Sequence, residues 1–130
     1  MARSNNAEVG AIAWVDLTVP DASGVRDFYR EVVGWTASDV EMGGYSDFCM
    51  NTPATARTVV GICHARGVNA GFPPQWLIYL NVADLESGLK AYVERGGTLL
   101  GNIRHMGTGD RYCVIQDPAG AVAALFEPAR

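Results

Sequence analysis

The side chains most often used in enzyme chemistry are few in this sequence and widely separated. It contains two histidines, His64 and His105, and three cysteines, Cys49, Cys63 and Cys113. No two of them have the close spacing of a zinc site, and each cysteine lies in an apolar run typical of a strand. We therefore expect three free, buried thiols rather than a disulfide or a CxxC metal site.

The two histidines differ in their surroundings. His64 ends an apolar run, and we expect it to be a solvated residue at the end of a strand. His105 lies in a glycine-bearing connection, residues 104–110, where an imidazole could act as an acid, a base or a hydrogen-bond donor. An ordinary surface histidine is the alternative at position 105.

A duplication supplies the elements that must position these residues. The stretch 14–35, WVDLTVPDASGVRDFYREVVGW, recurs in degraded form at 77–98 as LIYLNVADLESGLKAYVERGGT. At a single offset of sixty-three residues the identical pairs are Leu17/Leu80, Val19/Val82, Asp21/Asp84, Tyr29/Tyr92, Glu31/Glu94 and Gly34/Gly97. Two such units account for nearly all of the 130 residues, so the repeat is the architecture of the chain.

Each copy predicts a strand, a capped helix and three more strands. Asp21 and Asp84 are placed to cap the two helices, which Gly34 and Gly97 should end. The apolar faces predicted to point inward are Val25, Phe28, Tyr29 and Val32 in one helix, and Leu85, Leu89, Tyr92 and Val93 in the other. The strands are predicted at 11–19, 35–41, 45–51, 57–64, 75–82, 98–103, 110–116 and 121–127.

Composition supports a single domain over residues 1–130. Hydrophobic residues make up 48% of the chain and charged residues 18%, which is enough apolar material for a core. Module one is predicted at about 11–64, a Gly/Pro-rich linker at 65–74, and module two at about 75–128. The expected fold class is α+β.

Charge and hydropathy argue against several classes of partner. The formal net charge is −4 and the basic residues form no stripe, so nucleic acid and anionic membrane surfaces are poor partners. No apolar run approaches the roughly 18 residues of a membrane span. Residues 1–10 lack the apolar segment of a signal peptide, and we expect a cytoplasmic protein.

Several short motifs, together with the duplication, carry a family resemblance. They are FYREVVGW at 28–35, RGGT at 95–98, and DPAG at 117–120 before AVAALFEP. Over roughly residues 11–128 the chain resembles the vicinal oxygen chelate superfamily, which includes glyoxalase I, the bleomycin-resistance proteins and the extradiol dioxygenases. The resemblance implies two tandem βαβββ modules that form curved U-shaped sheets around a ligand-binding cleft, and a homodimer.

The resemblance also implies where a metal would be held. The family's metal enzymes take ligands from the first and last strand of each module, and in this chain those positions fall on Trp14, Gly61, Leu77 and Ala124. None of these side chains can hold a divalent cation. We therefore expect a metal-free protein without a cofactor.

Alternation along the strands extends the set of cleft residues that the resemblance implies. Residues two apart share a face, so the predicted ligand-binding set is Trp14, Asp16, Gly61, Cys63, Leu77, Tyr79, Ala124 and Phe126. A roomy cleft with aromatic walls and one carboxylate suits a flat organic molecule. The alternatives are that Trp14 fills the core and that Asp16 is an exposed residue near a strand end.

Three functions remain open on this basis. The first is a metal-independent binding protein that sequesters a small hydrophobic or aromatic compound, as bleomycin-resistance proteins do. The second is a metal-independent isomerase, epimerase or cyclase, with Asp16 or His105 as base and Tyr79 as hydrogen-bond donor. The third is a metal-dependent lyase or dioxygenase, which the missing ligands disfavour.

Overall fold

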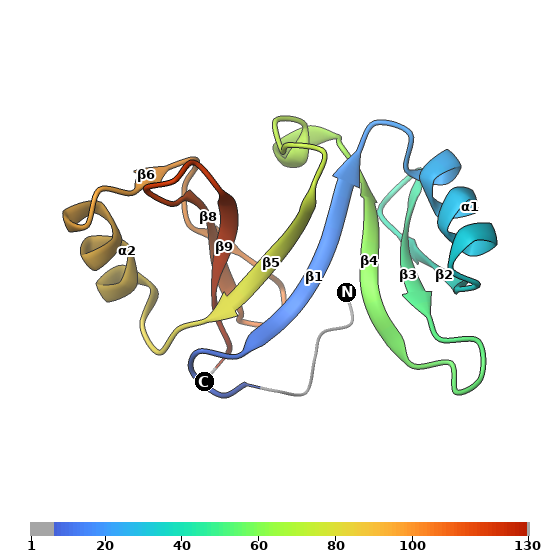
Figure 1. Cartoon of the computed structure of the whole chain (residues 1–130), viewed down its shortest axis with the longest axis horizontal. Coiled ribbons are helices and arrows are strands. Elements are labelled where there is room, and N and C mark those ends of the chain that lie inside the picture. Colours follow the sequence, from blue (N-terminus) through green and yellow to red (C-terminus); the bar gives the residue numbers. More distant parts are fainter. Residues whose placement is uncertain (1–6, 130) are drawn as a thin grey trace. The chain divides into compact units, whose positions relative to one another are not determined.

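A computed structural model describes residues 7–129, which form an α+β structure of two compact units (Figure 1). Unit 1 is Val15–Trp76, and unit 2 consists of residues 7–14 and 77–129. The first strand, β1 (Ile12–Val19), therefore begins in unit 2 and ends in unit 1. The predicted fold class, α+β with two tandem βαβββ modules, is confirmed.

The first module has the predicted order of elements. After β1 come α1 (Ala22–Val32), β2 (Thr36–Glu41), β3 (Ser46–Asn51) and β4 (Thr58–His64). The strand order is β2-β3-β4-β1, with β1 parallel to β4 and the other two pairs antiparallel. A short 3-10 helix, Gly67–Asn69, follows within the predicted linker.

The second module repeats this order, but its second strand is broken into β6 and β7. Its elements are β5 (Trp76–Asn81), α2 (Leu85–Glu94), β6 (Thr98–Leu99), β7 (Arg104–His105), β8 (Arg111–Gln116) and β9 (Val122–Glu127). The strand order is β5-β9-β8-β6, and β7 also pairs with β8. The strand β5 is parallel to β9, as β1 is to β4.

The two parallel pairs share one register. Asp16 lies opposite Gly61 in unit 1, and Tyr79 lies opposite Ala124 in unit 2, sixty-three residues later on both strands. The duplication seen in the sequence therefore extends to the pairing of the first and last strand of each module.

Both helices begin as predicted, but only one ends where the repeat indicates. The carboxylates of Asp21 and Asp84 accept hydrogen bonds from the backbone amides at the start of each helix. Gly34 follows α1 with φ +90°, whereas Gly96 (φ +91°), and not Gly97, follows α2. The second helix is one residue shorter than the first, so the prediction for Gly97 is wrong by one position.

Each sheet has one side that faces its helix. In unit 1, Leu17, Phe48 and Ile62 form a core with Ala22 of α1, and Val25 and Tyr29 pack against it. In unit 2, Leu125 faces α2, since a Cβ atom at Gly88 would lie 3.6 Å from its Cδ1. Because neighbouring residues of a strand point to opposite sides, the other side of each sheet can be assigned, and we call it the helix-free face.

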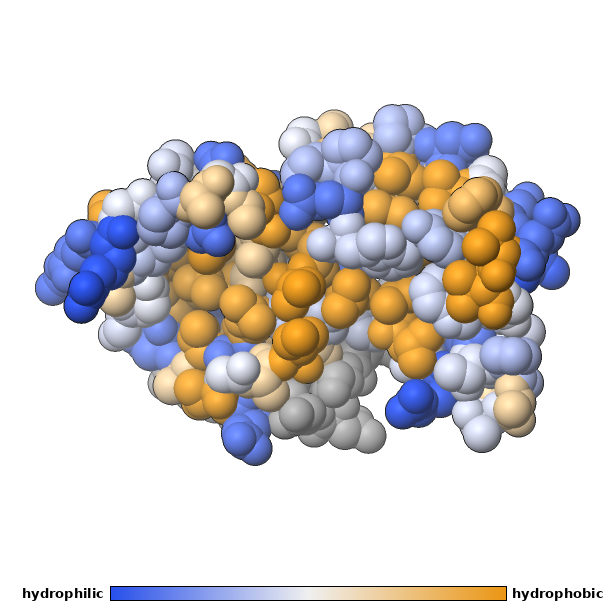
Figure 2. Space-filling model, viewed as in Figure 1, coloured by the Kyte–Doolittle hydropathy of each residue, from blue (hydrophilic) through white to orange (hydrophobic). Residues whose placement is uncertain are grey.

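The predicted inward faces of the helices are only partly buried. Phe28 and Val32 of α1 are 56% and 64% exposed, and Val93 of α2 is 52% exposed. The sheet covers only the stripe that carries Ala22, Val25 and Tyr29, and Phe28 packs edge-on against Tyr29 with 5.0 Å between ring centroids. Apolar surface is accordingly visible over the α1 end of unit 1 in Figure 2. The prediction for Phe28, Val32 and Val93 is wrong.

The strand predicted at 98–103 is broken by a bulge. Leu99 pairs with Ile115 and Arg104 pairs with Tyr112, so β8 advances three residues while the neighbouring chain advances five. The two extra residues loop out between β6 and β7, as in an extended β-bulge. The pattern of apolar residues contains no sign of this interruption.

Neither helix of residues 7–129 is long and apolar enough to cross a membrane.

A substitution at Gly97 tests how tightly α2 packs against its sheet. A Cβ atom there would lie 1.7 Å from the ring of Tyr92, whose hydroxyl donates to the Thr98 carbonyl and accepts from the Gln116 amide. Gly97→Ala should therefore lower the free energy of unfolding by about 1–3 kcal/mol, as overpacking does. Gly88→Ala is the control, because its Cβ makes ordinary contacts inside a helix and should stabilise by about 0.5–1 kcal/mol. Urea unfolding of both variants measures the difference, and equal stabilities would contradict the close packing.

Candidate functional site

The helix-free face of unit 1 is small and polar. It carries Asp16 on β1, Gly61 and Cys63 on β4, and Asp47 and Cys49 on β3. Asp16 is 4% exposed, so it is not an exposed residue near a strand end. A buried carboxylate is costly unless other groups stabilise it, which makes this face unusual for a structural surface.

Burial and negative charge keep the Cys63 thiol protonated. Burial is the main cause that raises its pKa far above the ordinary value, and the charges of Asp16 and Asp47 and a hydrogen bond to Asp47 raise it further. Burial also raises the pKa of Cys113. The three cysteines are free, and neither Cys63 nor Cys113 is suited to act as a thiolate nucleophile.

His64 and Asp47 form a pair that the sequence did not suggest. The Nδ1 atom of His64 lies 3.3 Å from Oδ1 of Asp47, which also accepts the His64 backbone amide at 2.8 Å. The ring packs between Tyr45 and Phe48, with centroid distances of 5.5 and 6.0 Å. The prediction of a solvated histidine is therefore wrong, because its side chain is only 18% exposed.

A sequence signal for Asp47 did exist. Asp110 lies sixty-three residues later, and it also accepts a backbone amide near the end of the neighbouring strand, that of Ala129 at 2.7 Å. Both aspartates are buried. Asp47 and Asp110 are thus a further identical pair, and each carboxylate binds the backbone near the end of the neighbouring strand.

The helix-free face of unit 2 is aromatic instead. Tyr79 packs against Tyr112 and Phe126, with centroid distances of 5.6 and 6.3 Å. Ala124 and Val114 lie beside them as a buried cross-strand pair. Flat rings of this kind suit stacking against an organic molecule.

Trp14 and Leu77 are also buried in unit 2, each 4% exposed. The indole Nε1 of Trp14 is shielded from solvent and has no hydrogen-bond partner among the residues that the structure describes. A buried donor without an acceptor costs about 1–3 kcal/mol. Core filling explains the burial of Trp14 but leaves this N–H unexplained.

The predicted ligand-binding residues thus fall into two groups. Unit 1 holds Asp16, Gly61 and Cys63, and unit 2 holds Trp14, Leu77, Tyr79, Ala124 and Phe126. His105 belongs to neither group, because it is exposed and lies opposite Arg111, whose side of the sheet faces α2. The structure does not bring His105 to the face that carries Tyr79.

The positions implied for a family metal do not fit a metal. Gly61, Ala124 and Leu77 have no donor atom in their side chains, and the indole N–H of Trp14 cannot ligate. The one group of three acidic, His or Cys side chains close enough for a cation, within the described part of the chain, is Asp84, Glu86 and Glu127. It lies on the other side of the sheet, beside α2.

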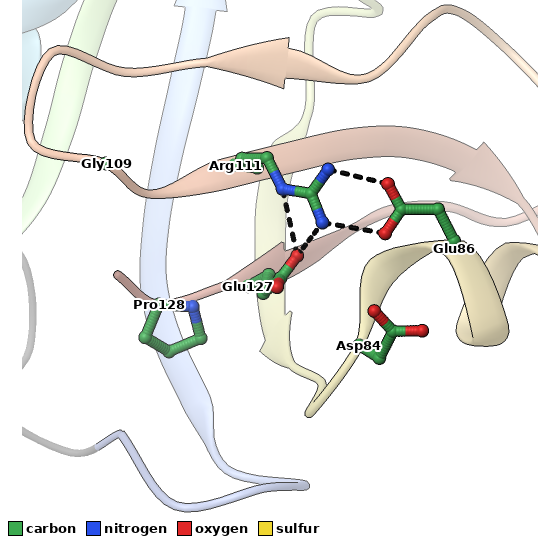
Figure 3. A pocket seen from close by; sticks show the side chains of 6 residues that line it. All are labelled: Asp84, Glu86, Gly109, Arg111, Glu127 and Pro128. Carbon is green, nitrogen blue, oxygen red and sulfur yellow. Dashed lines mark hydrogen bonds and ion pairs between the residues drawn. The ribbon is translucent and has the colours of Figure 1, made fainter. Parts of the chain in front are cut away.

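That acidic group already surrounds an arginine (Figure 3). Arg111 donates to both carboxylate oxygens of Glu86 at 2.6 and 2.7 Å, and its Nε donates to Glu127 at 3.0 Å. The residues line an open pocket of about 480 Å³ at the start of α2. Arg111 therefore joins the helix to β9, and we interpret the group as structural.

The Arg111 contact should make stability depend on pH. Hydrogen bonds from Arg111 lower the pKa of Glu86 from 4.5 to about 2, so the contact stabilises the fold above pH 4.5 and is lost as pH falls from 4.5 towards 2. Glu86→Gln should be less stable than the unaltered protein at pH 7, and the difference should shrink below pH 4.5. Thermal unfolding from pH 7 to pH 3 measures it, with Glu94→Gln, an exposed glutamate of the same helix, as control. A difference that is constant with pH would contradict the assignment.

A family model of the Glyoxalase/Bleomycin resistance protein/Dioxygenase superfamily matches residues 11–125. The chain is 31% identical over 134 residues to the putative glyoxylase CFP32 of Mycobacterium tuberculosis, an alignment that covers 100% of this chain and 50% of that protein. It is 33% identical over 129 residues to the anthracycline biosynthesis protein DnrV of Streptomyces peucetius, covering 90% and 46%. The chain thus spans about half the length of these curated relatives.

The structure is also similar to methylmalonyl-CoA epimerase of Streptomyces coelicolor, which was solved in complex with 2-nitronate-propionyl-CoA. The TM-score is 0.60 at 17% identity, and the match covers 95% of this chain and all of that chain. At this identity the likeness describes the fold.

Proposed function

Because the chain belongs to the glyoxalase/bleomycin resistance protein/dioxygenase superfamily, we propose that it is a metal-independent isomerase or epimerase of a small organic molecule. The observation that carries the proposal is Asp16, a buried carboxylate on the helix-free face of unit 1. Its counterpart in unit 2 is Tyr79, so the fold itself does not require a carboxylate there.

Asp16 is suited to be the general base of such a reaction. One large class of isomerases and epimerases removes a proton from a carbon next to a carbonyl, and a positioned carboxylate contributes about 10²–10⁴-fold to such a step. Opposite Asp16 lies Gly61, which has no side chain. The thiol of Cys63 on the same face stays protonated, so Cys63 does not compete for the role of base.

The side chains at Trp14, Gly61, Leu77 and Ala124 offer no ligand atoms, which supports an enzyme without the family's metal. The structure shares its fold with a methylmalonyl-CoA epimerase, and this likeness supports the proposed reaction class.

A binding protein that sequesters an aromatic compound is the second candidate. Tyr112 favours it, because this half-buried ring, packed against Tyr79, offers stacking surface without any acid or base. The relative DnrV is named for the biosynthesis of anthracyclines, which are polycyclic aromatic compounds. This candidate needs affinity but no turnover.

Proton exchange separates the two candidates. Methylmalonyl-CoA and a panel of 1,3-dicarbonyl compounds are incubated with the protein in D2O, and loss of the acidic C–H signal is followed by NMR. We expect exchange that survives EDTA and falls by about 10²-fold or more in Asp16→Asn. Asp39→Asn, at an exposed position of β2, is the control and should exchange normally.

The outcome is decisive in either direction. Binding of an anthracycline aglycone without exchange of any compound in the panel would favour the sequestering protein. Exchange that stops on addition of EDTA and returns with a divalent metal would overturn metal independence.

We also propose that the protein is a two-fold homodimer that accepts its ligand in each chain. Exposed apolar side chains on unit 1, namely Phe28, Val32 and Val33, support a partner surface. Light scattering at about 100 µM should give twice the 13.9 kDa mass of one chain. A monomer at that concentration would refute the dimer.

A further inference from the structure

A row of three side chains crosses the helix-free face of unit 2. Phe126 lies opposite Tyr112, and Tyr112 lies opposite Arg104 on the short strand β7. Directly paired residues share a face, so Arg104 lies on the side that carries Phe126 and Tyr112. We call these three residues the Arg104 row.

The Arg104 row combines two flat rings with a positive charge. Neighbouring strands lie roughly 4.8 Å apart, so the row spans roughly 10 Å from Phe126 to Arg104. Phe126 is only 1% exposed, so the accessible part of the row is formed by Tyr112 and Arg104. Tyr79 packs against both rings and holds them in place. Tyr112 and Arg104 are half-buried, so neither side chain of this cross-strand pair is fully hydrated.

Module one shows that the fold does not require this row. Cys63 occupies the position that matches Phe126, since both lie one residue before the end of the last strand of their module. Cys63 is hydrogen-bonded to Asp47, and Asp47 pairs with Val40 on β2. The matching row of unit 1 therefore carries a negative charge and no ring.

The bulge in the second module is what brings Arg104 to Tyr112. Two extra residues loop out between β6 and β7, and without them a different residue would pair with Tyr112. The charge of Arg104 lowers the pKa of Cys113, the residue after Tyr112 on β8, against the larger effect of burial, so Arg104 lies near this strand. A bulge that re-aims one side chain is typical of binding sites.

We propose that Arg104 binds a carboxylate of an organic ligand while Tyr112 contacts the ligand's flat apolar body. A guanidinium matches a carboxylate with two parallel N–H donors, and partial burial strengthens such a pair. The substrate class is thus an organic acid with a planar portion. This inference rests on the proposed small-molecule function and adds the charge of the ligand to it.

Binding of a matched pair of probes tests the proposal. 2-Naphthoate and 2-naphthamide have the same rings and differ in charge, and their affinities are measured by ligand-observed NMR. The protein should bind 2-naphthoate at least about tenfold more tightly, a difference of about 1.4 kcal/mol. High salt should reduce this preference.

Variants assign the preference to Arg104. Arg104→Gln should abolish the preference while leaving the affinity for 2-naphthamide nearly unchanged, and Arg104→Lys should restore part of it. Tyr112→Ala should weaken both probes alike. Arg95→Gln removes an exposed arginine of the same unit and should behave as the unaltered protein. Thermal unfolding establishes that each variant is folded.

Three outcomes would overturn the inference. These are no preference for 2-naphthoate, a preference that survives Arg104→Gln, and no binding of either probe at about 10 mM. Because the readout is binding, it is independent of the exchange experiment. A protein that prefers 2-naphthoate but catalyses no exchange would leave the inference standing and refute the isomerase.

Discussion

The parallel pairing of the first and last strand in each module is the constraint on which the rest of the structure depends. It places Asp16 against Gly61 and Tyr79 against Ala124 in one shared register. Since a slip of one residue would turn every side chain of a strand to the other side, this register decides which residues enter the core and which do not. The helices and their Asp caps occur in the same order in both modules.

The two copies have kept the same packing and changed their helix-free faces. Leu17/Leu80 and Val19/Val82 are identical pairs on the first strands, and Asp21/Asp84 cap both helices. On the faces that no helix covers, Asp16 is replaced by Tyr79 and Cys63 by Phe126. There unit 1 carries buried carboxylates and thiols, and unit 2 carries rings and an arginine.

The two helix-free faces thus suit different tasks, each within its own unit. Aromatic rings and a guanidinium can hold a planar organic acid, whereas a buried carboxylate can move a proton. Neither task is served by the acidic pocket at the start of α2, because Arg111 already neutralises Glu86 and Glu127 and ties the helix to β9. Charge in this protein thus has a structural use on one side of the sheet and a proposed chemical use on the other.

The sequence by itself determined the duplication, the order of the elements and the sharing of faces. Local rules suffice for these, because strand alternation, helix capping and turn residues act over a few neighbouring positions. The placement of Asp16, Gly61 and Cys63 on one side of a sheet needed, in addition, the register that the family resemblance implies. Only the tertiary structure decided the pairing of His64 with Asp47, the exposure of Phe28 and Val32, and the bulge that carries Arg104 to Tyr112. The His64–Asp47 pair depends on a contact between residues distant in the chain, and the exposure of Phe28 and Val32 depends on how much of a helix its sheet can cover. The bulge depends on where two strands shift their register. No local pattern encodes such quantities.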